Sequence, residues 1–328
     1  MRSATSLHIR GAVRILIVMI SVLVSWAPAW SENSFPRTVS HVFGETIVEK
    51  EPVRVVTLGW SGEDALLALG IQPVAMTRYR FFESGMFPWA EARIGKSAPI
   101  LLSGELDYEE IAALRPDLIL GVYSGMDQLS FRRLSAIAPT VAYRSGPWMA
   151  DWKEQLELVG DAVGKLGQAR ALISETTAAF SNLGNTYPVM AGKSFTFGTY
   201  FAGGNNFVIY LPSDPRVKAL TEMGLVSSAG VAELEKKHPG ETSVSLSLEE
   251  ISSIDADVLI MWYGEGARNA AEAQPLFGAL GAVKRGSYVA LELPVDVWST
   301  SALSVLSIPY GFPRFVPRLA EAARRSQE

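Results

Sequence analysis

Apolar residues recur with helical spacing through residues 151–183, the longest stretch of the chain that keeps such a pattern. Polar and charged residues fill the positions between them, as expected for helices that bury one face. Gly160, Gly164 and Gly167 favour two helices with a break near Gly164 over one continuous rod. The apolar positions, spaced mostly by three, four or seven residues, are Trp152, Leu156, Val159, Val163, Leu166, Leu172, Ile173 and Phe180.

A second pattern occurs twice, once on each side of this helical segment. Residues 106–120 read LDYEEIAALRPDLIL, and residues 246–260 read LSLEEISSIDADVLI. Each copy predicts a short helix, beginning at Asp107 or Ser247 with two glutamates in its first turn, followed by a buried strand. A repeated half on either side of a stiff helical segment indicates two lobes.

Buried strands alternate with helices in the first half. The apolar run 54–58 is followed by a turn, a helix over 63–69 and a second strand over 71–77. This order is typical of a parallel sheet, because parallel neighbours need a crossover connection.

We therefore predict an α/β fold with two Rossmann-like lobes joined by a long interdomain α-helix. The predicted boundaries are 32–150 for the N-terminal lobe, 151–184 for the linker helices and 185–328 for the C-terminal lobe. The second lobe closes with residues 301–325, where Pro309 to Pro313 predict a helix in two pieces.

The N-terminus has the layout of a secretory signal peptide, which we assign to residues 1–31. Arg2, Arg10 and Arg14 precede the uncharged apolar run 15–26, which gives way to small residues. The apolar run is short for a membrane-spanning helix, so cleavage is favoured over a retained membrane anchor. The sequence therefore predicts an exported protein.

Composition limits the classes of function. The formal net charge is −5, and the predicted leader carries three arginines but no acidic residue, so its removal makes the chain more acidic. A mildly acidic exported chain is not expected to bind nucleic acid through bulk charge. The absence of cysteine excludes disulfides, thiolate metal sites, a cysteine nucleophile and a lipidated cysteine. We expect the mature chain to diffuse freely in the periplasm.

Enzyme chemistry finds little support in the sequence. Neither a phosphate-binding glycine-rich loop nor a His-x-x-x-His metal motif occurs. Residues 59–63, GWSGE, lie between a strand and a helix, as a hydrolase elbow does, but Glu63 replaces the final glycine of that motif. We predict that the chain is not an enzyme. The alternative from another functional class is an exported hydrolase that uses Ser61 near an acidic residue.

Loops that follow the predicted strands carry many aromatic and cationic residues. Residues 78–89, RYRFFESGMFPW, hold two arginines and five aromatic residues without helical or strand periodicity. Ligands of parallel α/β proteins lie outside the carboxyl ends of the strands, so these loops form the candidate binding site. Aromatic rings and guanidinium groups suit a bulky ligand that is partly apolar and partly anionic. The candidate ligand-binding residues are Trp60, Arg78, Arg80, Phe82, Tyr123, Tyr143, Arg144, Tyr200, Trp262, Tyr263 and Trp298.

Glu109 and Glu249 occupy matched places in the two copies of the repeat. The helix dipole favours a glutamate in the first turn, which explains either residue taken alone. Their matched places on two lobes favour a two-point acidic docking surface for a partner with basic pockets.

Three motifs and the linker helices resemble the periplasmic substrate-binding proteins of iron-siderophore, haem and cobalamin import, the class III architecture. The motifs are RVVTLGWSGEDALLALGIQPVAMT, LDYEEIAALRPDLIL and SVSLSLEEISSIDADVLIMW, and the resemblance covers essentially the whole mature chain. It implies a monomer without a cofactor that captures an iron(III)-siderophore complex between its lobes and delivers it to an inner-membrane ABC permease. It also implies that Glu109 and Glu249 stand where the family's glutamates engage arginines of the permease.

The resemblance leaves haem and cobalamin open as alternative ligands. No histidine lies in the candidate loops, so we expect no metal site on the protein itself and a metal that arrives fully chelated. Haem ligation by histidine is disfavoured, whereas ligation by a tyrosine stays open. Because a long linker helix resists bending, lobe movement on binding is expected to be small.

Overall fold

The computed structural model describes residues 34–201, 203–204 and 206–327. The predicted signal peptide, residues 1–31, lies outside the described residues, and its assignment stays a prediction. From Phe35 onward the chain forms one compact unit. Within the described part of the chain, no helix combines the length and the apolar character needed to cross a membrane.

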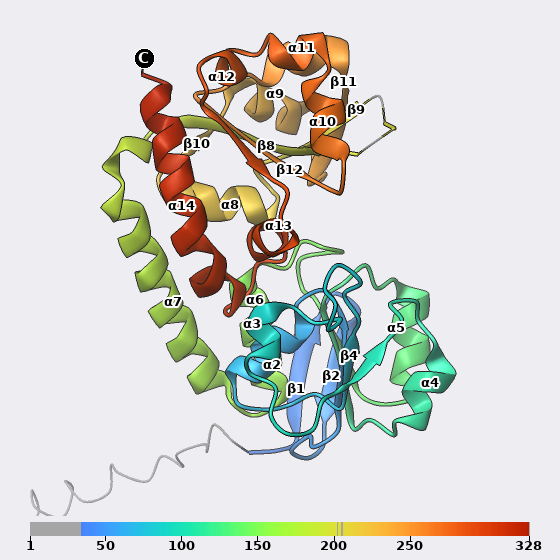
Figure 1. Cartoon of the computed structure of the whole chain (residues 1–328). Coiled ribbons are helices and arrows are strands. Elements are labelled where there is room, and N and C mark those ends of the chain that lie inside the picture. Colours follow the sequence, from blue (N-terminus) through green and yellow to red (C-terminus); the bar gives the residue numbers. More distant parts are fainter. Residues whose placement is uncertain (1–33, 202, 205, 328) are drawn as a thin grey trace, which may run out of the picture. The chain divides into compact units, whose positions relative to one another are not determined.

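The first lobe, in the lower half of Figure 1, is built on a parallel sheet of five strands in the order β5-β4-β3-β6-β7. The strands are β3 (Val55–Gly59), β4 (Ala75–Thr77), β5 (Ile100–Leu102), β6 (Leu118–Tyr123) and β7 (Thr140–Ala142). A hairpin of β1 (Arg37–His41) and β2 (Gly44–Val48) precedes them. The strand–helix–strand order predicted from the apolar runs is confirmed.

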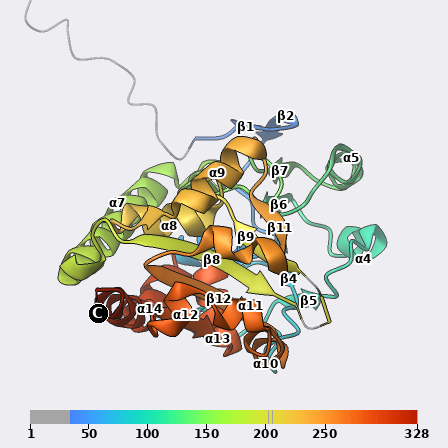
Figure 2. The ribbon, with the colours of Figure 1, turned by 90° about the horizontal axis from the view of Figure 1, so that it is seen from above.

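Helices cover both faces of the first sheet: α4 and α5 lie together on one side (Figure 2), and α2 packs on the other. Because successive side chains of a strand point to opposite faces, Val55 and Leu118 join the core with α2, whereas Val56 and Ile119 join a second cluster with α4 and α5. The helices of this half are α2 (Gly62–Ala68), α3 (Pro88–Glu91), α4 (Tyr108–Ala113) and α5 (Gln128–Ser135).

The second lobe contains a six-stranded mixed sheet, in the order β11-β9-β8-β12-β13, with β10 paired to β8. Its strands are β8 (Ser194–Tyr200), β9 (Asn206–Tyr210), β10 (Val226–Ser227), β11 (Ser243–Ser247), β12 (Val258–Tyr263) and β13 (Tyr288–Leu291). β9 runs antiparallel to both of its neighbours, whereas β8, β12 and β13 are parallel.

Eight short helices and the long α14 complete the described part of the second lobe. They are η1 (Pro188–Met190), α8 (Pro215–Glu222), α9 (Ala229–Lys237), η2 (Leu248–Ile254), α10 (Ala267–Glu272), α11 (Pro275–Gly278), α12 (Gly281–Lys284), α13 (Pro294–Ser301) and α14 (Ser307–Arg325). The helix predicted in two pieces over 301–325 is different in the structure. The interruption lies at residues 302–306, and Pro313 and Pro317 sit inside the continuous α14.

The linker consists of α6 (Trp152–Ala162) and α7 (Leu166–Thr186), which confirms two helices rather than one rod. Gly164 lies at the break with a φ of +73°, a conformation that side-chain-bearing residues avoid. Asp151 caps α6 by accepting hydrogen bonds from the backbone amides of Lys153 and Glu154. α7 ends two residues beyond the predicted boundary at 184.

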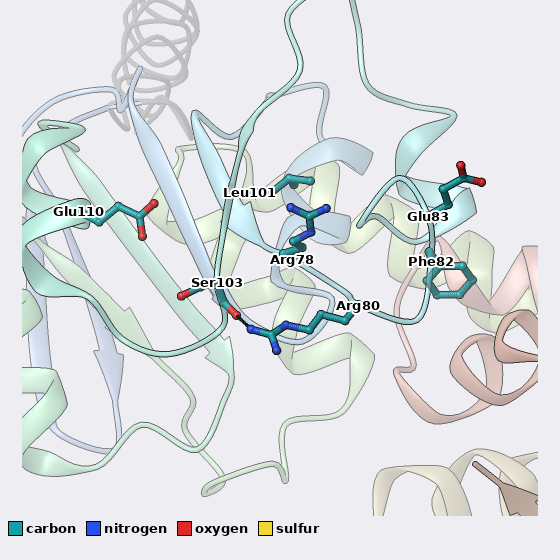
Figure 3. Close-up of a pocket in the computed structure, with 7 residues that line it drawn as sticks. All are labelled: Arg78, Arg80, Phe82, Glu83, Leu101, Ser103 and Glu110. Carbon is teal, nitrogen blue, oxygen red and sulfur yellow. Dashed lines mark hydrogen bonds between the residues drawn. The ribbon is translucent and has the colours of Figure 1, made fainter. Parts of the chain in front are cut away.

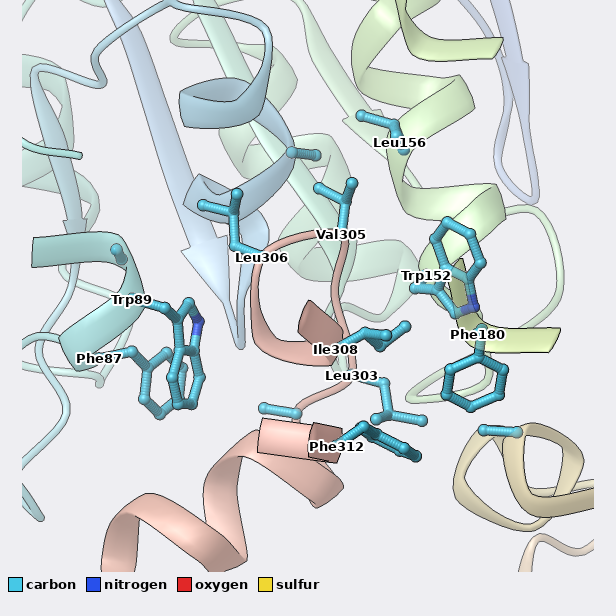
Figure 4. Close-up of a cluster of buried hydrophobic side chains, with 14 of the residues drawn as sticks. Phe87, Trp89, Trp152, Leu156, Phe180, Leu303, Val305, Leu306, Ile308 and Phe312 are labelled. Carbon is cyan, nitrogen blue, oxygen red and sulfur yellow. The ribbon is translucent and has the colours of Figure 1, made fainter. Parts of the chain in front are cut away.

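One hydrophobic core continues from the first lobe through the linker into the second lobe. Figure 4 shows the segment that carries Leu303 and Ile308 between Trp89 of α3 and Trp152 of α6, and all four side chains belong to this core. Gln155 of α6 donates from Nε2 to the carbonyl oxygen of Leu303 at 3.3 Å. The lobes are therefore joined by packed side chains as well as by the two helices.

Candidate ligand-binding site

The end of β3 is fixed against the end of β6. The backbone amide of Trp60 donates to the carbonyl oxygen of Tyr123 at 2.9 Å. Gly59 has a φ of +88°, and a Cβ there would lie 2.2 Å from the same oxygen, so only glycine fits. This close approach places the side chain of Trp60 beside the carboxyl end of β6.

Aromatic side chains from both lobes meet at this place. The ring of Trp298, from α13, lies 4.1 Å from that of Trp60 and 4.6 Å from that of Phe81, measured between centroids. Trp262 of β12 lies 6.3 Å from Trp298. We call this group the interlobe aromatic cluster; its members are Trp60, Phe81, Tyr123, Trp148, Phe201, Trp262 and Trp298.

Part of the interlobe aromatic cluster is open to solvent. Phe81 is 53% exposed, Trp148 is 41% exposed and Phe201 is 52% exposed, although rings of this size are usually buried. Exposed aromatic rings gathered from several elements provide rigid contact area for a ligand.

An arginine of α8, in the second lobe, lies beside the cluster. The guanidinium group of Arg216 lies 3.5 Å from the ring centroid of Tyr210, whose hydroxyl accepts a hydrogen bond from Nε1 of Trp262 at 3.0 Å. Arg216 donates from Nε and Nη2 to the two carboxylate oxygens of Asp214, at 2.7 and 2.6 Å. The side chain of Asp214 is only 1% exposed, so this is a desolvated bidentate pair.

Electrostatics connect Arg216 with the first lobe. Burial works to lower the pKa of Arg216, but Asp214 and Tyr210 outweigh it and raise that pKa above its ordinary value. Burial raises the pKa of Tyr123 to about 12, and the charge of Arg216 opposes this rise. Arg216 is thus a permanent cation, and Tyr123 is a neutral hydroxyl near it across the lobes.

Two buried carboxyl groups lie at the start of α2, next to the cluster. The hydroxyl of Tyr79 donates to Glu63 at 3.0 Å, and Nε1 of Trp89 donates to Asp64 at 2.7 Å. The hydroxyl of Ser304 also donates to Asp64, which ties the second lobe to the first. Burial, and then the neighbouring Asp64, raise the pKa of Glu63 well above its usual range, while burial raises the pKa of Asp64 to about 7.

A separate hollow of about 590 Å³ lies at the ends of β4 and β5. Figure 3 shows Arg80 directed toward Ser103, whose carbonyl oxygen accepts a hydrogen bond from it at 3.4 Å. Its lining consists of Arg78, Arg80, Phe82, Glu83, Leu101, Ser103 and Glu110. Because β4 and β5 follow β3 in the sheet order, this hollow flanks the aromatic cluster along the same sheet edge.

A family model described as "Periplasmic binding protein" matches residues 55–291, most of the chain. The chain belongs to the periplasmic binding protein family. Because this is a family of binding proteins, the predictions that the chain is not an enzyme and needs no cofactor are confirmed on that ground. The predicted α/β fold with class III architecture is confirmed as well.

Individual relatives of this periplasmic binding protein agree with that assignment. The probable siderophore-binding lipoprotein YfiY of Bacillus subtilis (strain 168) is 31% identical over 280 residues, which cover 82% of this chain and 83% of the relative. The Fe(3+) dicitrate-binding periplasmic protein FecB of Escherichia coli (strain K12) is 25% identical over 242 residues, which cover 71% of this chain and 74% of the relative.

Among solved structures, PiaA of Streptococcus pneumoniae TIGR4 in complex with ferrichrome superposes with a TM-score of 0.80 at 31% identity. That match covers 88% of this chain and 99% of PiaA. The relatives include periplasmic proteins and lipoproteins, both of which are exported classes of protein.

Four of the residues predicted from the sequence lie together in the interlobe aromatic cluster: Trp60, Tyr123, Trp262 and Trp298. Three others, Arg78, Arg80 and Phe82, line the flanking hollow instead. The buried Tyr79 lies between the two arginines in sequence and stacks on Phe87, so its neighbours point away from the rings.

Three tyrosines predicted as ligand contacts are buried inside their lobes, which corrects the prediction for them. Tyr143 donates to the carbonyl oxygen of Met126, Tyr200 donates to that of Gly204, and the hydroxyl of Tyr263 bonds that of Tyr288 at 2.6 Å. Each is no more than 3% exposed. Strand alternation explains the difference, because Tyr263 follows Trp262 and therefore points to the opposite face.

Arg144 is also placed differently from the prediction. Its guanidinium group lies 3.3 Å from Glu157 of α6 and donates to the carbonyl oxygen of Ser40 in β1. This arginine therefore ties the hairpin to the linker helix, and no contact with the cluster follows from its position.

The sequence analysis did not identify Tyr210, Arg216 and Trp148, whereas Phe81 lies inside the predicted loop 78–89 without being among the candidate residues named there. Neither Tyr210 nor Arg216 follows a parallel strand, because Tyr210 ends the antiparallel β9 and Arg216 lies in the first turn of α8. The signal for Arg216 was the stretch Asp214-Pro215-Arg216, which predicts a capped helix start with a charged residue beside the cap.

The hydrolase alternative is overturned by the environment of Ser61. Its side chain is fully buried, and its hydroxyl lies 3.4 Å from Oε1 of Gln155. A nucleophile must reach its substrate, which this hydroxyl does not. Among the described residues, no group of three or more His, Asp or Glu side chains is arranged to hold a metal ion.

Proposed function

We propose that the chain captures an iron(III)-siderophore complex between its lobes and delivers it to an inner-membrane ABC permease. The interlobe aromatic cluster carries this proposal, because both lobes contribute rings and a polar group to one place. The names of the relatives support the same class of ligand, although they differ in the chelator they specify.

In this proposal the protein holds the organic chelate and not the metal. The rings of Trp60 and Trp298 pack on the apolar parts of the chelate, while Arg216, Tyr123 and Tyr210 bond its oxygens. Because the rings of Trp60 and Trp298 are only 4.1 Å apart, side-chain rotation precedes entry of a bulky ligand.

Replacing Trp298 with alanine is expected to weaken binding of a ferric siderophore at least about tenfold, since a central tryptophan often dominates an interface. Quenching of tryptophan fluorescence during titration with ferric chelates measures the affinity. The wild-type chain should bind one of them with a Kd below about 1 µM.

Trp298→Phe serves as the control, because it keeps a ring in the cluster and should retain most of the affinity. Full affinity in Trp298→Ala would remove this residue from the site. Haem as the ligand would instead produce a Soret shift on titration, and ferric siderophores would then leave the fluorescence unchanged.

We also propose that the mature chain works in the periplasm as a monomer. The predicted leader and the absence of a cysteine that could carry a lipid support this location. Release of the protein by osmotic shock would agree with it, whereas retention in the membrane fraction would contradict it.

Small-angle scattering is expected to give the mass of one chain and almost the same radius of gyration with and without ligand. The continuous core through Leu303 and Trp152 and the hydrogen bond from Gln155 resist closure of the lobes. A large fall in the radius of gyration on binding would contradict this expectation.

A further inference from the structure

The charge of Arg216, the cation beside the interlobe aromatic cluster, is already balanced. Both carboxylate oxygens of Asp214 accept hydrogen bonds from Arg216, and the carboxylate is 1% exposed. A guanidinium group has five N–H donors, so the pair keeps donors free for a ligand but contributes no net charge. Arg216 therefore offers hydrogen bonds without offering an unmatched positive charge.

The arginines that the sequence suggested as anion-binding groups lie outside the interlobe aromatic cluster, and each has carboxylates in its surroundings. Arg144 pairs with Glu157 at 3.3 Å, away from the cluster. Arg78 and Arg80 line the flanking hollow together with two glutamates, Glu83 and Glu110.

The buried carboxyl groups beside the cluster add no positive charge in any protonation state. Glu63 and Asp64 are fully buried, and Tyr79, which bonds Glu63, lies 6.4 Å from Trp60 between ring centroids. When protonated they are neutral, and when ionised they repel an anion. Neither state supplies the positive charge that would compensate a strongly negative ligand.

Binding a highly charged chelate here removes it from water without an opposite charge to compensate. Uncompensated burial of an ion is costly even after relaxation of the protein, whereas a neutral chelate avoids that penalty. Three hydroxamate groups cancel the charge of iron(III), whereas three catecholates or two citrates leave excess negative charge on the complex.

We infer that this site selects ferric chelates without net negative charge, such as trihydroxamates, and that Asp214 sets this preference by neutralising Arg216. The inference rests on the proposed function and narrows its ligand class. It replaces the expectation from the sequence that the ligand is partly anionic.

A series of ferric trihydroxamates with one common core tests the inference independently of ligand shape. Ferrioxamine B carries a terminal amine, which can be left free, acetylated or succinylated to give a cationic, neutral or anionic complex. Titration of the wild-type chain at low and high salt is expected to show affinity at least about tenfold weaker for the succinylated complex than for the acetylated one. Ferric enterobactin is expected to bind more weakly still.

Asp214→Asn is the matched variant. Asparagine caps helices as well as aspartate, so α8 keeps its start while the charge of Arg216 is uncovered. The variant should bind the succinylated complex at least about tenfold more tightly than the wild type does. Its Kd for the acetylated complex should stay within about threefold of the wild-type value. A melting temperature measured beforehand shows that the variant is folded, and the wild-type series stands without it.

The outcomes separate this inference from the proposed function. Tight wild-type binding of anionic chelates in preference to neutral ones overturns the inference and leaves siderophore capture intact. An unchanged ratio of affinities in Asp214→Asn removes the role assigned to Asp214. Failure of every ferric chelate to bind overturns the proposed function itself.

Discussion

The double variant Glu109→Arg/Glu249→Arg is expected to lose siderophore-dependent iron uptake while its Kd for the ligand stays within about twofold of the wild-type value. Both glutamates are exposed, and both lie in the first turn of their helices, α4 and η2. Reversing two charges replaces attraction to basic pockets of the permease by repulsion. Growth on the ferric siderophore as the iron source, and uptake of labelled iron, measure the effect.

The helix starts should survive these substitutions. Asp107 caps α4 by accepting from the amides of Glu109 and Glu110, and Ser247 forms a capping box with Glu250. Because the caps do not use the side chains of Glu109 and Glu249, only the helix-dipole interaction is lost, at about 0.3–1 kcal/mol for each residue.

Glu51→Arg/Glu241→Arg is the control, since it makes the same change of charge at exposed positions outside both helix starts. This control should transport iron normally and appear in the periplasmic fraction at the wild-type level. Normal uptake by Glu109→Arg/Glu249→Arg would remove both residues from permease docking. Loss of ligand affinity in that variant would assign them a different role.

The parts of the fold that follow local rules could be predicted from the sequence. Asp107 and Ser247 begin helices because their side chains accept from amides of the first turn. Gly164 divides the linker because a left-handed residue ends a helix. Trp60 and Tyr123 could be placed together because both end neighbouring parallel strands.

The rest of the site depends on tertiary packing that no local pattern specifies. Tyr143 and Tyr263 looked like loop residues at strand ends, but the direction of each side chain depends on register within its strand. Arg216 belongs to the site only because antiparallel β9 brings α8 beside Trp262. The prolines of α14 predicted a break that helix packing overrides, since Phe312 and Val316 are buried around Pro313.

Asp64→Asn is expected to stabilise the chain strongly at pH 8 and to leave its stability nearly unchanged at pH 4. Burial raises the pKa of Asp64 to about 7, so the folded chain must bury a charge once that proton is lost. The rise from an ordinary value near 3.8 corresponds to a penalty on the order of 4 kcal/mol at alkaline pH. Asparagine removes the charge and keeps an oxygen to accept from Trp89 and Ser304.

The direction of the pH dependence follows from proton binding. Between about pH 4 and pH 7 the unfolded chain has released the Asp64 proton while the folded chain retains it, so stability falls as pH rises through this window. Above about pH 7 Asp64 adds no further pH dependence to the stability, while Glu63, whose pKa burial raises well above its usual range, continues the decline.

Urea unfolding at pH 4.5, 6 and 8 measures the free energy of unfolding for the wild type, Asp64→Asn and Asp127→Asn. Asp127 is an exposed helix cap whose pKa is lowered by hydrogen bonds from the amide and hydroxyl of Ser130, so its variant should show no gain at pH 8. Equal stability of Asp64→Asn and the wild type at pH 8 would mean that Asp64 is not buried as a charge, and the acid pair would then lose its role in the pH response.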